Sequence, residues 1–239
     1  MSKTYNEPPI EIYWVSGSPF GWRVLLTAEL KNVPYVSRRI DNATGVQSSS
    51  EYLAINPRGK VPALTHGDVV VCESLAMMTY LDQLFPEPPI FGTSPREAAR
   101  IMQACSEFMC YLEPVINRLA AAIVRNKHLS AAALADRQGT LHSELARLDR
   151  ALQNEVWLAG ALSAADLTIY PHCKFLLRLA RRPGAASLDL GLADFAERYP
   201  ALSAWMHRIE ALPVYDRAYP PHWRETDNPP AWDRLVAQN

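Results

Sequence analysis

The stretch that decides the fold is "VSGSPFGWRV", residues 15–24, where an apolar run ends and a serine and a proline open a helix-like run. Residues 10–16 alternate as a β-strand does, and residues 22–30 favour a helix. Proline is common in the first helical turn, because its missing N–H would have no partner there. Ser18 is therefore predicted to cap this helix, with its hydroxyl beside the exposed N–H groups and the positive end of the helix dipole.

A serine at this position has two interpretations. It can be a plain helix cap with no further role. It can also help to hold an anion, because a helix N-terminus with a hydroxyl donor suits a thiolate or a phosphate. The local sequence leaves both interpretations open.

The composition of the whole chain excludes several classes of protein. The 239 residues carry 24 basic and 25 acidic side chains, a net charge of −1, so we expect neither a nucleic-acid nor a membrane partner. No apolar run approaches the roughly 18 residues of a membrane span, and the N-terminus lacks the apolar middle of a secretory signal. A reduced, cytoplasmic compartment and no metal site are expected from four cysteines without CxxC spacing: Cys72, Cys105, Cys110 and Cys173.

The first 86 residues predict a small α/β domain with the order βαβ followed by ββα. The first two strands should be parallel, because a helix connects them. The last two should form a hairpin around the turn at 65–68. The predicted strands are 10–16, 35–40, 61–64 and 69–72, and the predicted helices are 22–30, 48–56 and 74–85.

Beyond a Pro-rich linker at 87–94, residues 95–239 predict an all-helical domain. Pro114 is expected to kink the first of its helices. From about residue 215 the chain is rich in proline and aromatics, which predicts an irregular tail. Residues 220–232 should pack on the body, because Trp223 and Trp232 are costly to leave in water. The predicted helices are 95–124, 130–152, 163–180 and 200–211.

Two further stretches resemble binding motifs. In "NPRGKVPAL", 56–64, a proline at the start of a strand is a frequent cis-proline site. The backbone of Val61 would be free at a sheet edge, where an extended peptide could pair with it. In "CESLAMMTYL", 72–81, Ser74 would cap a helix and bind a carboxylate, and Glu73 would bind an ammonium group. Taken singly, an ordinary turn and an ordinary cap explain the two stretches equally well.

Taken together, the order and intervals of these motifs resemble the cytosolic glutathione transferase family. The motifs are Ser-Pro-Phe at 18–20, Lys60-Val61-Pro62 and Glu73-Ser74. Ser163 and Asp166 in "LSAADLTIYP", 162–171, match the capping box that this family carries in its second domain. The resemblance covers about residues 10–212. It implies glutathione transferase architecture: an α/β thioredoxin-like N-terminal domain, then an all-α C-terminal domain.

The resemblance also implies roles for single residues. In serine-type members, of which the tau and zeta types are closest in motif, the residue matching Ser18 donates to the glutathione thiolate. Val61 would pair with the cysteinyl backbone of glutathione, and Glu73 and Ser74 would hold its γ-glutamyl end. Lys60 would reach a glutathione carboxylate, although a solvated lysine is the alternative. Two further hydroxyls lie close to Ser18 in the sequence and remain weaker candidates for the thiolate donor, Tyr13 and Ser16.

The electrophile would bind beside the helix that starts near residue 95. We select Phe20, Ser106 and Tyr111 as candidates for its pocket. Helical spacing favours core positions for three other residues of the same helix, Met102, Cys105 and Met109.

The resemblance implies an enzyme that conjugates glutathione, as co-substrate, to a small hydrophobic electrophile. It implies neither a metal nor a nucleotide, and it implies a homodimer. A glutathione-dependent isomerase, dehalogenase or etherase on the same scaffold is the first alternative. A non-catalytic binding or regulatory protein of the same fold is the second.

Overall fold

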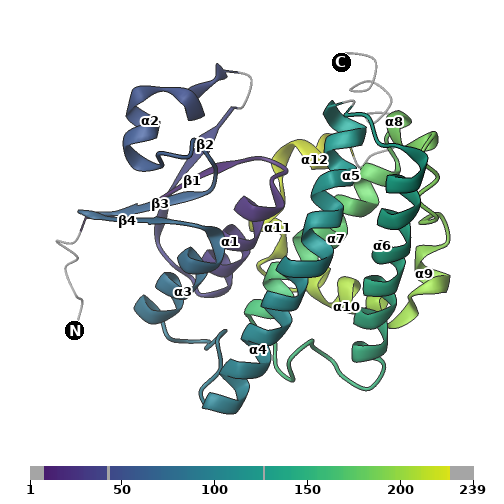
Figure 1. Ribbon diagram of the computed structural model, residues 1–239. Coiled ribbons are helices and arrows are strands. Elements are labelled where there is room, and N and C mark those ends of the chain that lie inside the picture. The colour runs from purple at the N-terminus through teal and green to yellow at the C-terminus, as the bar shows by residue number, and fades with distance from the viewer. Residues whose placement is uncertain (1–7, 42–43, 126, 227–239) are drawn as a thin grey trace. The chain divides into compact units, whose positions relative to one another are not determined.

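The computed structural model describes residues 8–41, 44–125 and 127–226. Their contacts divide the chain into two compact units (Figure 1). The first contains residues up to Pro89 and also takes in the segment 214–226. The second runs from Ile90 to Pro213. Within the described ranges, we find no helix that is both long and apolar enough to cross a membrane.

The first unit is built on a four-stranded mixed sheet with the order β2-β1-β3-β4. β1 is parallel to β2, whereas β3 is antiparallel to both β1 and β4. This topology confirms the predicted βαβ-ββα order. The strands are β1 (Ile10–Val15), β2 (Tyr35–Ile40), β3 (Ala63–His66) and β4 (Val69–Cys72).

Helices cover both faces of this sheet. Figure 1 shows α2 on one face, and α1 and α3 packed together on the other. α1 is buried along most of its length, which explains why its sequence is apolar almost all round. The helices are α1 (Pro19–Leu30), α2 (Ser50–Ile55) and α3 (Ser74–Leu84), with a 3₁₀ turn, η2 (Val46–Ser48), before α2.

The peptide bond between Val61 and Pro62 is cis, as the sequence predicts. The prediction of a sheet edge at this point is wrong. β3 lies inside the sheet, between β1 and β4, and its ladder begins at Ala63. Val61 therefore belongs to the turn that enters an interior strand.

The second unit is all helical, as predicted. Its first long helix is interrupted by a π-helical turn, η3 (Phe108–Leu112), directly before Pro114. Proline has no N–H to donate to the carbonyl four residues earlier, so the regular α-helical ladder cannot run through this point. The helices are α4 (Pro95–Glu107), α5 (Glu113–Arg125), α6 (Ala131–Leu152), α7 (Ala164–Ala180), α8 (Pro183–Ala186), α9 (Phe195–Arg198) and α10 (Pro200–Glu210).

α7 is the buried helix of this unit, and the predicted capping box holds its first turn. Asp166 accepts hydrogen bonds from the Ser163 backbone N–H at 2.9 Å and from the Ser163 hydroxyl at 3.0 Å. It also accepts from the Leu158 N–H at 3.0 Å and the Trp205 indole N–H at 2.8 Å. Burial raises the pKa of Asp166, and these four donors oppose that rise. One carboxylate therefore joins the start of α7 to α10.

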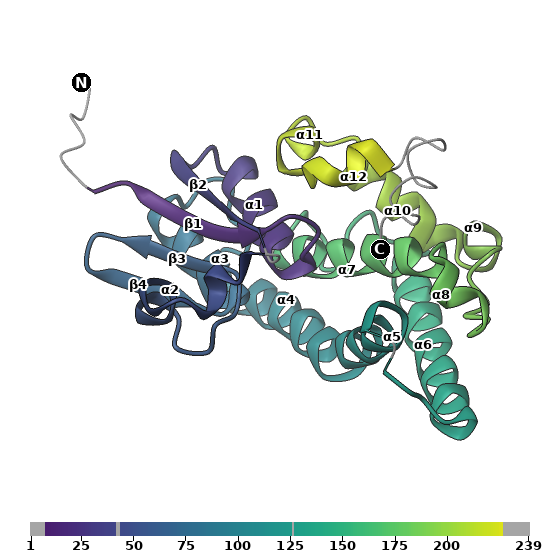
Figure 2. The ribbon, with the colours of Figure 1, turned by 90° about the horizontal axis from the view of Figure 1, so that it is seen from above.

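The C-terminal segment differs from its prediction in two ways. It forms two short helices, α11 (Tyr215–Ala218) and α12 (Pro221–Thr226), rather than an irregular tail. It also belongs to the first unit, where α11 lies against α1 (Figure 2). The reason is the aromatic surface of Trp22, which Tyr215, Tyr219 and Trp223 cover. Trp223 is buried as predicted, whereas Trp232 lies outside the described residues.

Candidate functional site

The turn between β1 and α1 places Ser18 at the cap of α1, as predicted. The Ser18 N–H donates to the Val15 carbonyl at 3.1 Å, and its hydroxyl oxygen accepts from the Gly21 N–H at 3.4 Å. A hydroxyl that accepts in this way still carries its own proton. Ser18 is half-buried and can therefore offer this proton to a ligand at the start of α1.

The electrostatics of this helix start favour an anion. Pro19 occupies the first helical position, and the first turn of α1 has no acidic side chain. The positive end of the helix dipole is therefore not offset by a carboxylate of the helix's own first turn. A thiolate or carboxylate placed here would meet both the exposed N–H groups and the Ser18 hydroxyl.

The strand register brings the other predicted site residues to the same end of the sheet. Tyr13 pairs with Ala63, and Ala63 pairs with Cys72, so these three positions lie in one row. β1 and β4 both run toward this end, and β3 starts from it. Ser18 follows β1, Glu73 follows β4 and Val61 precedes β3. Residues that are distant in the sequence therefore lie together at one end of the sheet.

Glu73 has an unusual backbone conformation. Its φ is +69°, a region that side chains other than glycine rarely adopt, and it caps α3 without a side-chain capping bond. Its side chain is exposed, whereas Ser74 is the first helical residue and is buried. The prediction of Ser74 as the cap is therefore wrong by one residue. Strained conformations of this kind gather at ligand sites, which makes Glu73 a binding candidate.

Two hydrogen bonds from residues of the first unit fix the turn before β3. The Tyr52 hydroxyl and the Asn56 side-chain amide both donate to the Lys60 carbonyl, at 2.6 Å and 2.7 Å. The Lys60 side chain stays exposed, and Val61 is half-buried beside the cis-proline. The backbone that would meet an extended peptide is therefore fixed, while the lysine remains in solvent.

The two alternative hydroxyls are engaged elsewhere. Tyr13 donates to a carboxylate oxygen of Glu11 at 2.7 Å, and burial raises its pKa. The Ser16 hydroxyl shares a hydrogen bond with Nδ1 of His222 at 2.6 Å. Tyr13 and Ser16 are therefore weaker candidates for a thiolate donor than Ser18. No sequence pattern pointed to His222, because some two hundred residues separate it from this turn.

The residues selected for the electrophile pocket remain predictions. Phe20 is half-buried, and the Arg23 guanidinium lies 5.0 Å from its ring centroid. Ser106 and Tyr111 are exposed. Of the three residues predicted for the core, Cys105 is buried, but Met102 and Met109 are exposed. Both methionines lie beside the buried face of the helix, which is formed by Ile101, Cys105, Phe108 and Leu112.

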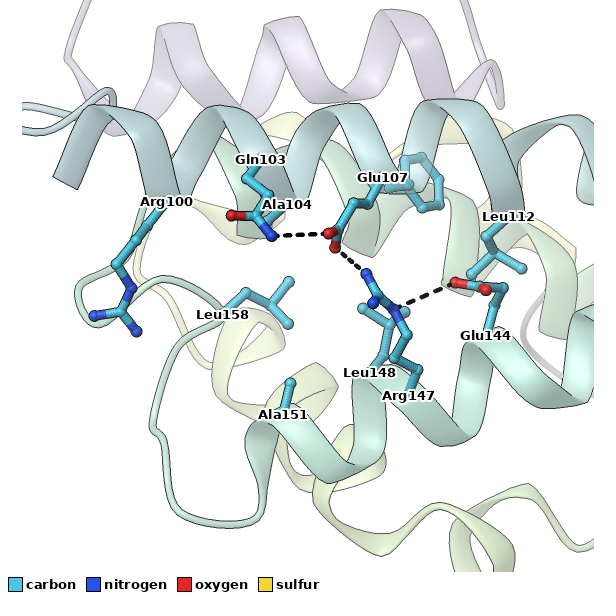
Figure 3. A pocket seen from close by; sticks show the side chains of 11 residues that line it. Arg100, Gln103, Ala104, Glu107, Leu112, Glu144, Arg147, Leu148, Ala151 and Leu158 are labelled. Atoms are coloured by element: carbon cyan, nitrogen blue, oxygen red, sulfur yellow. Dashed lines mark hydrogen bonds and ion pairs between the residues drawn. The ribbon is translucent and has the colours of Figure 1, made fainter. Parts of the chain in front are cut away.

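A cavity of about 290 Å³ lies in the second unit between α4 and α6 (Figure 3). Gln103 donates to Glu107 at 2.9 Å, and Arg147 pairs with both Glu107 and Glu144. Among the described residues, its lining does not include the three electrophile candidates. Because four charged side chains, Arg100, Glu107, Glu144 and Arg147, line this cavity, it is a poor site for an apolar electrophile.

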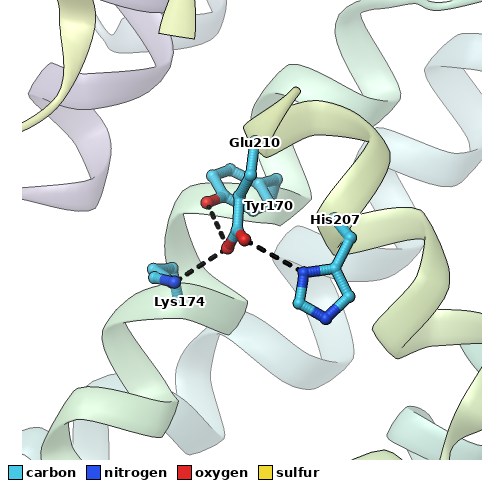
Figure 4. A network of polar contacts seen from close by, with 4 residues as sticks. All are labelled: Tyr170, Lys174, His207 and Glu210. Atoms are coloured by element: carbon cyan, nitrogen blue, oxygen red, sulfur yellow. Dashed lines mark hydrogen bonds and ion pairs between the residues drawn. The ribbon is translucent and has the colours of Figure 1, made fainter. Parts of the chain in front are cut away.

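A second polar network joins α7 to α10 (Figure 4). Glu210 accepts from Lys174 at 2.8 Å and from the Tyr170 hydroxyl at 3.1 Å, and it pairs with His207 at 3.2 Å. Burial raises the pKa of Glu210, but these partners outweigh it and hold the pKa below the usual value. The network is a structural tie within the second unit.

Comparisons with known proteins agree with this geometry. A family model described as "Glutathione S-transferase, N-terminal domain" matches residues 12–89, and one described as "Glutathione S-transferase, C-terminal domain" matches residues 131–208. Glutathione S-transferase A of Pleuronectes platessa is 29% identical over 233 residues, which cover 90% of this chain and 93% of that protein. A Caenorhabditis elegans protein named "Probable maleylacetoacetate isomerase" is 24% identical, covering 92% and 97%.

Among solved structures, a glutathione S-transferase from the Antarctic clam Laternula elliptica superposes with a TM-score of 0.74 at 27% identity. The match covers 95% of this chain and 98% of the clam protein. The two family models together match well over half of this chain, one in each unit. The chain therefore belongs to the glutathione S-transferase family.

Proposed function

We propose that the protein conjugates glutathione to a small hydrophobic electrophile and that the Ser18 hydroxyl donates a hydrogen bond to the glutathione thiolate. The observation that carries this proposal is the position of Ser18 at the start of α1, where its hydroxyl accepts from Gly21 and keeps its own proton for a ligand. Membership of the glutathione S-transferase family supports the choice of glutathione as the ligand.

The chemistry follows from the pKa of the thiol. A free thiol has a pKa of about 8.5, so little of it is ionised at neutral pH. A helix N-terminus and a hydroxyl donor together can lower that pKa by about 2 units, or about 2.7 kcal/mol. The thiol proton passes to water. The sulfur lone pair then forms a C–S bond, and the electron pair displaced from carbon leaves with the departing group or takes up a proton.

Four residues at the same end of the sheet would hold the rest of glutathione. The Val61 backbone would pair with its cysteinyl backbone, and Lys60 would meet a carboxylate. Glu73 would bind the γ-glutamyl ammonium, because its carboxylate is exposed at the end of β4. Ser74 lies in the first turn of α3, where free N–H groups favour the γ-glutamyl carboxylate. Phe20, Ser106 and Tyr111 remain the candidates for contact with the electrophile.

Isomerisation is the second candidate, and the similarity to the Caenorhabditis elegans protein favours it. In such a reaction the thiolate adds to a carbon–carbon double bond, bond rotation follows, and the same C–S bond breaks to return free glutathione. Mass spectrometry of the products separates the two reactions. A conjugate gains the mass of glutathione, whereas an isomer keeps the mass of its substrate.

We also propose a cytoplasmic homodimer. All four cysteines are free thiols, which fits a reducing compartment. β4 lies at the edge of the sheet and exposes Val69 and Val70, the latter by 48%. Exposed apolar side chains on an edge strand favour an interface. Light scattering after size exclusion should give about twice the 26.7 kDa mass of the chain, and a monomer at all concentrations would contradict the dimer.

The test of Ser18 is a titration of the bound thiol. Ser18→Ala should raise the apparent pKa of glutathione's thiol toward its free value, read from the ultraviolet absorbance of the thiolate at saturating glutathione. Conjugation should slow by about 100- to 1000-fold, the range for loss of one preorganised donor. Ser18→Thr should restore much of both, because threonine keeps a hydroxyl.

Ser130 provides the matched control, since its side chain caps α6 by accepting from the Ala133 N–H at 3.2 Å. Ser130→Ala should cost about 1 kcal/mol of stability and leave the thiol pKa unchanged. If the wild type and Ser18→Ala give equal thiol pKa values, the role assigned to Ser18 is wrong. If calorimetry detects no glutathione binding by the wild type, the transferase proposal itself fails.

A further inference from the structure

We propose that His222, near the end of the described chain, is a positioning residue for the turn that carries Ser18. The inference rests on the proposed function of Ser18 and adds to it. The hydrogen bond between Nδ1 of His222 and Oγ of Ser16 is 2.6 Å long and joins α12 to the β1–α1 turn. The C-terminal segment 214–226 would thereby become part of the machinery that activates glutathione.

The imidazole contacts Gly17 as well as Ser16. A Cβ atom added at Gly17 would lie 2.6 Å from Cε1 of His222 and 2.8 Å from the indole nitrogen of Trp223. Gly17 also has a φ of +81°, which residues other than glycine rarely adopt. The turn therefore needs glycine for two reasons, its own backbone conformation and the closeness of α12.

This turn is a place where a single contact can affect Ser18. The Ser18 N–H bonds back to the Val15 carbonyl, so Ser16 and Gly17 are the two central residues of a β-turn. The peptide unit between two such residues can rotate and convert one turn type into another. A hydrogen bond on the Ser16 side chain, together with a ring lying over Gly17, restrains this rotation. The Ser18 hydroxyl is then held in one direction before glutathione arrives.

The rest of the segment is anchored independently of His222. Trp223 is only 3% exposed, and its ring centroid lies 5.3 Å from that of Trp22 in an edge-to-face arrangement. Arg217 pairs with Glu29, with 2.6 Å between the two charged groups. Because these contacts hold α11 and α12 on α1, loss of the His222 side chain should leave the segment in place. Positioning can therefore be separated from anchoring by experiment.

The test compares two replacements of His222. Asparagine places an amide near the position of Nδ1 and can donate to the Ser16 hydroxyl or accept from it, so it works with either tautomer of the original imidazole. Alanine removes the bond. His222→Ala should lower kcat by about 3- to 10-fold and raise the apparent thiol pKa of bound glutathione by up to about one unit, the usual worth of one hydrogen bond. His222→Asn should restore both values.

A double-mutant cycle assigns the effect to the bond itself. Ser16→Ala should match His222→Ala, and the double variant should lose no more than either single variant, because both remove the same interaction. Arg224→Ala is the matched control. Arg224 is exposed on the same helix and pairs with Asp216 of the segment, so its loss should leave the thiol pKa unchanged.

The outcomes separate this inference from the proposed function. An unchanged thiol pKa in Ser18→Ala contradicts the proposed function itself. A raised pKa in Ser18→Ala with a wild-type value in His222→Ala overturns only the positioning role. Additive effects of Ser16→Ala and His222→Ala, or a failure of His222→Asn to restore the pKa in a folded protein, overturn it as well.

Discussion

Glu73 combines a strained backbone with an exposed carboxylate, and the two can be tested separately. Glycine at this position would accept the φ of +69° without strain, whereas alanine would keep the strain. Glu73→Gly should therefore stabilise the protein by roughly 1 kcal/mol relative to Glu73→Ala. Both should weaken glutathione binding by about 1.5–3 kcal/mol, the worth of a hydrogen bond to a charged group.

Urea unfolding gives the stabilities, and isothermal titration calorimetry gives the glutathione affinities. Glu73→Gln tests the charge alone and should also weaken binding, because it keeps the length of the side chain and removes only its charge. Unweakened binding in Glu73→Gln would contradict an ammonium partner. A less stable Glu73→Gly variant would show that the positive φ carries no strain.

For single residues, the sequence predicts those contacts whose partners are close along the chain. The cap at Ser18 and the capping box of Ser163 and Asp166 depend on contacts three residues apart, and both are confirmed. The cap of α3 was misplaced onto Ser74, because nothing in the local sequence signals a positive φ at Glu73. The contact of His222 with Ser16 could not be predicted, because no local sequence pattern indicates a partner so distant in the chain.

Between elements, the Glu210 network that joins α7 to α10 makes the stability of the second unit depend on pH. The pKa of Glu210 is lower in the folded protein, so its ionised form stabilises the fold at a pH above its unfolded pKa of about 4.3. That stabilisation should disappear as the pH falls through the lower folded pKa. Glu210→Gln should therefore lower the melting temperature at neutral pH, and the gap to the wild type should close in acid.

Differential scanning calorimetry from neutral pH into acid measures this gap. Glu197→Gln, an exposed residue of the short helix α9, is the control for loss of one acidic charge. A gap that widens toward low pH would reverse the sign expected for a carboxylate stabilised by Lys174.

Element types and order were predictable, because the strands and long helices follow simple apolar periodicities. The interior position of β3 was not, since strand order depends on which strands pair in space. The short helices α8, α9, α11 and α12 were also missed. Each has four to six residues, too few for a helical period to repeat, whereas the equally short α2 is marked by the proline that follows it, Pro57.

At the scale of the whole molecule, the first unit includes a segment, 214–226, that follows the second unit in the sequence. A chain that ends at Pro213 should lose the cover of Trp22 and the burial of Tyr215 and Trp223. Its first unit should be less stable by about 3 kcal/mol or more, since each large aromatic contributes about 1.5–3 kcal/mol on burial. A chain that ends at Thr226 separates this contribution from that of the later residues.

Urea unfolding followed by tryptophan fluorescence measures this loss, and circular dichroism verifies that the shortened chain is folded. Equal midpoints for the chains that end at Pro213 and Thr226 would contradict a stabilising role of the segment. The sequence predicted that Trp223 is buried but assigned the tail to the wrong unit. Apolar composition shows that a segment needs cover without showing which surface supplies it.

The hydrogen bond between Ser16 and His222 can form only late in the synthesis of the protein, because its two partners lie near opposite ends of the chain. Ribosomes add about 5–20 residues per second, and domains generally fold from the N-terminus as they emerge. The turn that carries Ser18 is therefore synthesised roughly 10–40 s before His222. During that interval the apolar face of α1 around Trp22 is bare, and a nascent chain stalled before its last turns of helix would present that face to chaperones.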